Sequence, residues 1–140
     1  MNLIRIKHID QLVIKAKDEF QKGQHHISWQ LLEEAHIFSQ PFSLIHSYVH
    51  WEMLVLSFKT NDRAEFFGQI LRLVLAAPSS ILKTYPTGNN GRSRAGLFTH
   101  FKISNILEKK LIKLDKLEAK RIKSGGKIVK YIRKHPIRYD

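Results

Sequence analysis

Apolar residues recur every three or four positions along the first 78 residues, and this period predicts amphipathic helices. The expected helices span residues 9–22, 28–40, 42–59 and 63–77. Gly23, Pro41 and the Thr-Asn-Asp at 60–62 separate them, since these residue types favour helix ends and turns. The helix over 42–59 carries the longest apolar stripe, so we expect it to be the central helix. Ser28 is the expected N-cap of the second helix, because its hydroxyl can accept a backbone N–H.

The four predicted helices resemble two copies of one helical hairpin. Phe20 and the turn after it correspond to Phe58 and its turn, and Pro41 corresponds to Pro78, at an offset of 37 to 38 residues. This period is close to that of two-helix solenoid repeats, but two copies are too few for a solenoid. We therefore predict an all-α fold in which residues 1–101 form a compact helical domain of two stacked antiparallel helical hairpins.

A turn-rich segment and a basic helix complete the chain. Residues 79–96 are the richest turn segment of the chain, with Pro86, Gly88, Asn89, Asn90 and Gly91, and this predicts an ordered loop. An amphipathic helix is expected over residues 104–123, with Leu107, Leu111 and Leu114 on one stripe and Gly125-Gly126 as its break. We assign residues 102–140 to a basic amphipathic helical tail.

The composition excludes several classes of protein. The chain has 140 residues and no cysteine, which excludes disulfides, thiolate zinc sites and thiol catalysis. Charges interrupt the apolar residues of the N-terminus, so no signal peptide is expected there. The longest apolar runs are too short to span a bilayer. We therefore expect a cytoplasmic protein without a transmembrane segment.

The positive charge belongs to the tail. The net charge is +12, of which residues 1–100 supply +3 and residues 101–140 supply +9. Clustered Lys and Arg at residues 102–138 are typical of a surface that binds a polyanion, an anionic membrane or an acidic protein. The tail lacks a recognisable nucleic-acid module, so a solvated lysine face on a helix packed through its leucines remains the alternative. An alternative function is therefore a non-enzymatic interaction module that contacts a protein partner or a polyanion through this tail.

Histidines gather on both sides of the Pro41 turn. His46 and His50 are spaced i,i+4 and therefore share one helix face, and Glu33 and His36 are spaced i,i+3 on the preceding helix. His36 lies five residues before Pro41 and His46 five after, so an antiparallel hairpin brings the two faces together. The spacing predicts that the three imidazoles converge on one point.

Such a cluster is typical of a transition-metal site. Neutral imidazole suits Zn, Ni, Fe or Cu, and Glu33 or Glu34 is the expected fourth ligand or orienting carboxylate. Because the sequence offers no separate general base, we expect metal binding and not an enzyme. The alternative is that these histidines form hydrogen bonds between packed helices. His25 and His26, which follow Gly23, are expected in a solvated loop.

A second site hypothesis concerns Asn89, Asn90, Gly91 and Arg92. Small residues allow successive backbone N–H groups to point into one concavity, and an arginine adds a bidentate partner for an anion. The alternative is a structural loop, with Arg92 capping a helix or pairing with a core carboxylate such as Glu52.

The chain resembles a family of small bacterial proteins known only as a domain of unknown function. The segments LLEEAHIFSQP, HSYVHWEML, GQILRLVLAAPSS and YPTGNNGRS carry the resemblance. They match the pattern ExAHIxSQP, HxxxHWxML, GQxxRL and PxGNxGRS across residues 11–96, whereas the part after Phe101 departs from it. The matching positions are His36, Gln40, His46, His50, Trp51, Gln69, Arg72, Asn89, Gly91 and Arg92. The resemblance supports these residues and implies no activity.

Overall fold

The computed structural model describes the backbone of residues 2–81 and 86–134 and the side chains of residues 2–75 and 86–125. Its elements are α1 (Leu3–Gln21), α2 (His25–Ser39), α3 (Ser43–Lys59), α4 (Arg63–Ile81) and α5 (Asn105–Lys134). Every regular element in these residues is a helix, which confirms the all-α prediction.

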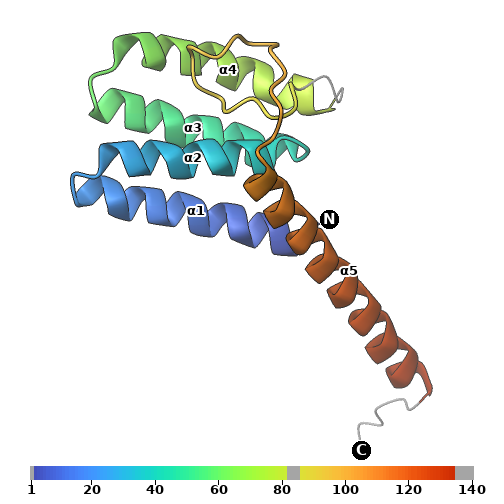
Figure 1. Cartoon of the computed structure of the whole chain (residues 1–140). Coiled ribbons are helices and arrows are strands. Elements are labelled where there is room, and N and C mark those ends of the chain that lie inside the picture. Colours follow the sequence, from blue (N-terminus) through green and yellow to red (C-terminus); the bar gives the residue numbers. More distant parts are fainter. Residues whose placement is uncertain (1, 82–85, 135–140) are drawn as a thin grey trace, which may run out of the picture.

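The first four helices form two stacked hairpins (Figure 1). α1 packs against α2 and α3 against α4, while α2 and α3 lie together in the middle of the stack. The loop over residues 86–104 returns across α4 and α3 before α5 begins (Figure 1). This order places the Pro41 turn between the two central helices and brings the loop over it.

The two hairpin turns have the same hydrogen bonds at an offset of 38 residues. Gly23 N–H donates to Phe20 O in the first turn, and Asn61 N–H donates to Phe58 O in the second. Gly23 and Asn61 both have positive φ, at 77° and 55°. A left-handed residue of this kind is the usual helix C-terminal cap. The internal repeat that the sequence predicts is therefore present in the backbone.

The core lies between α1, α2 and α3. Its buried members are Ile9, Leu12, Val13, Ala16, Trp29, Leu32, Ala35, Phe38, Val49, Met53 and Leu56. We expected the third helix to be the central one, but α2 has seven buried residues among 15 and α3 has six among 17. α2 lies between α1 and α3, whereas α3 exposes Leu44, Trp51 and Phe58 to solvent.

Several helix ends differ from the predicted ones. α1 begins at Leu3, where the Asn2 side chain accepts the Arg5 N–H. Ser28 is not an N-cap: it lies in the first turns of α2, is buried, and its hydroxyl donates to Ala16 O. His25 and His26 are exposed but helical, since α2 starts at His25. α4 continues past Pro78 and α5 past Gly125-Gly126.

α5 is fastened to α1 along its first half. Leu107, Leu111 and Leu114 pack against the core, as the leucine stripe predicted. Arg5 binds the Asp115 carboxylate through a hydrogen bond of 2.6 Å, and α5 then extends away from the helical stack (Figure 1). The division of the chain at residues 101 and 102 stays a prediction. In the described part of the chain, no helix has both the length and the apolarity needed to cross a membrane.

Candidate metal centre

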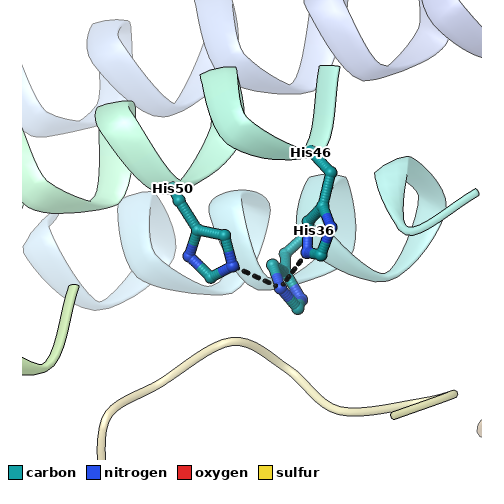
Figure 2. A group of neighbouring side chains, drawn as sticks. All are labelled: His36, His46 and His50. Carbon is teal, nitrogen blue, oxygen red and sulfur yellow. Dashed lines mark hydrogen bonds between the residues drawn. The ribbon is translucent and has the colours of Figure 1, made fainter. Parts of the chain in front are cut away.

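Three imidazoles meet between α2 and α3. His36 Nε2 lies 3.1 Å from His50 Nε2 and 2.9 Å from His46 Nε2. Figure 2 shows the His46 and His50 rings, which come from α3, pointing toward the His36 ring from α2. All three side chains are buried. The juxtaposition arises from the Pro41 turn, which makes the two histidine-bearing faces neighbours.

The protonated nitrogen of His36 is fixed by the loop. His36 Nδ1 lies 2.9 Å from the backbone carbonyl oxygen of Asn89. A carbonyl oxygen only accepts hydrogen bonds, so Nδ1 carries the proton. In the neutral ring, Nε2 therefore presents a lone pair toward the other two histidines.

The protonated nitrogen of His50 is fixed in the same way by Gln69. His50 Nδ1 lies 2.8 Å from Gln69 Oε1. The Gln69 amide nitrogen donates to the Glu65 carboxylate at 2.7 Å and to Gly91 O at 2.8 Å, so its orientation is determined. His50 Nδ1 must then donate to Gln69 Oε1, and His50 Nε2 also presents a lone pair.

These two assignments place two lone pairs 3.1 Å apart in a buried site. No neutral tautomer that keeps both Nδ1–H bonds satisfies the contact between His36 Nε2 and His50 Nε2. Burial lowers the pKa of His36 well below its ordinary value, and it lowers the pKa of His46 to about 3 and of His50 to about 4. A bridging proton is thus disfavoured near neutral pH, whereas the three histidines form a group that could hold a metal ion.

The nitrogen positions suit a single transition-metal ion. One ligand atom from each histidine lies within 4.8 Å of the other two. In a tetrahedral site with metal–nitrogen bonds of about 2.0–2.1 Å, ligand nitrogens are about 3.3–3.4 Å apart. The two Nε2 contacts need to lengthen by only a few tenths of an ångström to reach that spacing. The donors that fix Nδ1 would also orient the rings toward the ion.

The two glutamates on α2 have other partners. Glu33 is not part of the histidine group: its carboxylate accepts a hydrogen bond from Asn90 and lies 3.5 Å from Arg92 Nη1. Glu34 binds Lys110 of α5 at 2.8 Å. Glu33 precedes His36 by one turn, but the ring of His36 turns toward α3 while the carboxylate faces the loop. The carboxylate nearest the triad through hydrogen bonds is instead Glu65.

The loop expected to cradle an anion uses its N–H groups internally. Gly91 N–H donates to Asn89 Oδ1 and Arg92 N–H to Asn90 Oδ1. The Ser93 N–H donates to the Glu65 carboxylate, and Gly88 N–H to Gln40 Oε1. Each of these four donors therefore already has an acceptor within the protein. The structural alternative fits these contacts, and the loop serves as the outer support of the histidines.

Arg92 stabilises the loop from its outer side. Its Nε lies 3.2 Å from the Glu65 carboxylate, and its guanidinium stacks over the Trp29 ring at 3.7 Å from the centroid. A core carboxylate is therefore its partner, but Glu52, the partner suggested from sequence, binds Lys17 instead.

Gly91 lies against the His36 ring. A Cβ added at Gly91 would lie 2.7 Å from two ring atoms of His36, and the residue has φ of +81°. Only glycine adopts this backbone readily and leaves room for the imidazole. The loop backbone therefore closes directly over the histidine.

The spacing of residues did not identify the polar side chains that support the triad from α4, and of these the family resemblance included Gln69 and Arg72 but not Glu65. Glu65, Gln69 and Arg72 are all buried, and their spacing of four and three residues puts them on one face of a helix that is otherwise apolar. A buried polar stripe of that kind was the signal that could have identified them. Hydrogen bonds to Gln69 and Ser93 lower the pKa of Glu65 although burial raises it, so the carboxylate stays charged.

Comparison with known proteins adds a family. A family described as "Protein of unknown function (DUF3703)" matches residues 5–111, which extends beyond Phe101 into the first turns of α5. No curated protein and no solved structure matches the chain significantly. The match covers most of the 140 residues and includes every residue of the histidine cluster and its supporting loop. The chain therefore belongs to this family of unknown function.

Proposed function

We propose that this protein binds one transition-metal ion through the Nε2 atoms of His36, His46 and His50. The observation that carries the proposal is the pair of lone pairs facing each other at 3.1 Å, on rings whose other nitrogens donate to Asn89 O and Gln69 Oε1. His46 Nε2 lies 2.9 Å from His36 Nε2 and can donate to that lone pair, but the lone pair of His50 Nε2 then still lacks a donor among the described residues. A buried polar group without a partner costs about 1–3 kcal/mol. A metal ion at this point would convert the unfavourable contact into coordination.

The donor set favours Zn, Ni, Fe or Cu over Mg or Ca. Neutral imidazole nitrogens are ligands that transition metals prefer, whereas Mg and Ca require oxygen ligands such as carboxylates. The group of three histidines contains no carboxylate. Zinc suits a tetrahedral site with three protein ligands and one open position. The described residues place no general base at the histidines, so the proposal is binding and not catalysis.

The proposal is tested by titrating tag-free, chelator-treated protein with Co²⁺ and then with Zn²⁺. We expect one equivalent of Co²⁺ to produce the intense visible absorption of a tetrahedral site, and one equivalent of Zn²⁺ to remove it. A His25→Ala/His26→Ala variant is the control, because these exposed histidines precede the site on α2 and should not contribute. No absorption at one equivalent, or its loss in the control variant, would contradict the proposal.

A second function is favoured by one face of α5. Lys109, Lys113, Lys116, Lys120 and Lys123 are all exposed and are spaced alternately by four and three residues, so they form one stripe. Asp115 and Glu118 lie on the opposite side, where they contact α1. We propose that this lysine stripe binds the phosphate backbone of duplex nucleic acid without sequence preference.

Removing three charges from the stripe should weaken duplex binding and its dependence on salt. We expect the triple variant Lys113→Gln/Lys116→Gln/Lys120→Gln to bind a random 20-base-pair DNA with a shallower salt dependence. The negative slope of the logarithm of the binding constant against the logarithm of the salt concentration should decrease in magnitude by about 2.7. Fluorescence anisotropy at several salt concentrations measures this slope. The matched control is Lys7→Gln/Lys15→Gln/Lys59→Gln, which removes three exposed charges elsewhere. Equal slopes for the two variants would refute the assignment to α5.

A further inference from the structure

The histidine triad forms one wall of a small cavity. Its other lining residues are Arg72, Leu75, Pro86, Leu97 and Phe98. The cavity has a volume of about 30 Å³, which is enough for a few non-hydrogen atoms but too small for an organic substrate. Because three histidines leave one position of a tetrahedral ion open, the cavity is where a fourth ligand would sit.

The charges around this cavity are all positive or neutral. The three imidazoles are neutral as metal ligands, because each binds an ion through the lone pair of an unprotonated ring nitrogen. The Arg72 guanidinium is buried and stays charged, as arginine does in proteins. It donates to the carbonyl oxygens of Arg92 and Ala95, and neither partner compensates its charge.

The closest buried carboxylate is already committed. Glu65 accepts hydrogen bonds from Gln69 Nε2, Ser93 N–H and Ser93 Oγ, and it pairs with Arg92. It reaches His50 only through Gln69. A divalent ion at the triad would therefore add two positive charges beside Arg72 with no anionic side chain in the cavity.

We infer that the open position takes a small inorganic anion, held jointly by the metal ion and by Arg72. The inference rests on the proposed metal binding and specifies its fourth ligand. The size of the cavity limits the anion to a few non-hydrogen atoms, such as azide, cyanate or nitrite. The half-buried apolar side chains of Leu75 and Leu97 lower the local dielectric and so strengthen the attraction between opposite charges.

Azide titration of the Co²⁺ protein tests the inference. Bound Co²⁺ is first measured by elemental analysis, and the change in visible absorption then gives the azide affinity. We expect saturable azide binding to wild type, an affinity about 10- to 100-fold lower for Arg72→Gln, and a near-normal affinity for Arg72→Lys. Arg63→Gln is the matched control, since Arg63 is an exposed arginine on the same helix.

Arg72 also donates hydrogen bonds to two loop carbonyl oxygens, so Arg72→Gln could change azide binding by displacing the loop. A second variant separates this effect from the loss of charge. Leu97→Trp fills the cavity without changing charge, so it should keep one equivalent of Co²⁺ and lose the azide response. Full Co²⁺ binding with no azide response in wild type would overturn this inference alone. Unchanged azide affinity in both Arg72→Gln and Leu97→Trp would overturn it as well. Failure to bind Co²⁺ in wild type would instead overturn the proposed function.

Discussion

A His46→Ala/His50→Ala variant should lose Zn²⁺ affinity by a factor on the order of 10⁴. Structural zinc sites with four ligands bind with about 10–16 kcal/mol, which corresponds to about 3 kcal/mol per ligand. Two lost ligands therefore cost about 6 kcal/mol, or roughly four powers of ten. Competition with a chromophoric chelator measures the affinity of both proteins.

This variant also leaves two holes in the core, so folding must be checked beside binding. His46→Gln/His50→Gln keeps most of the side-chain volume and serves as the second variant, with circular dichroism as the folding readout. The His25→Ala/His26→Ala protein controls for the removal of two histidines. Wild-type affinity in a folded Gln variant would show that the ion binds elsewhere.

The metal-free protein should lose stability as the pH falls from 6.5 to 4.5. The pKa values of the three histidines are lowered in the folded state, to about 3 for His46 and about 4 for His50. Below pH 6.5 the unfolded chain therefore binds more protons than the folded chain, and the free energy of unfolding decreases as the pH falls. Each imidazole contributes a slope of about 1.4 kcal/mol per pH unit, an upper bound where the three rings interact. Net stabilities of about 5–15 kcal/mol make this a large fraction of the total.

Urea unfolding at several pH values, with a chelator present, measures this effect. The window stops at pH 4.5 because Glu65, whose pKa is lowered from 4.5, begins to contribute below it. The His46→Gln/His50→Gln variant should show a flatter slope, and the His25→Ala/His26→Ala variant should keep the wild-type slope. An equally steep slope in the Gln variant would assign the pH dependence to other groups.

The parts of the structure that depend on local sequence were predictable. Apolar periodicity and the turn residues at Gly23, Pro41 and Asn61 yield the four helices, their pairing and the internal repeat. The juxtaposition of His36 with His46 and His50 follows from the same information, because a hairpin turn fixes which residues become neighbours. Burial was harder to predict, since it depends on which faces pack: Phe67 and Trp51 are large and apolar, yet they are 68% and 53% exposed.

The supporting residues of the site could not be placed from spacing. Glu33 precedes His36 by one helical turn, but the side chain that supports His50 is Gln69, and its own partner is Glu65. These contacts depend on how α4 and the loop pack across the hairpin, which no periodicity specifies. The family resemblance did include Gln69, Arg72, Asn89 and Gly91. It identified the residues without indicating that they surround the histidines.

The loop over His36 also bears on the order in which the molecule assembles. The hairpins connect residues close in sequence, and such contacts form early in folding. The bond from His36 to Asn89 joins residues 53 positions apart, so closing this part of the chain carries a larger entropic cost. We therefore expect the hairpin turn to bring the imidazoles together while they are still hydrated, and the loop to cover them afterwards. Under the proposed function, an ion that binds during this interval would meet an open site, and closure of the loop with Asn89 and Gly91 would then remove its water and align the rings.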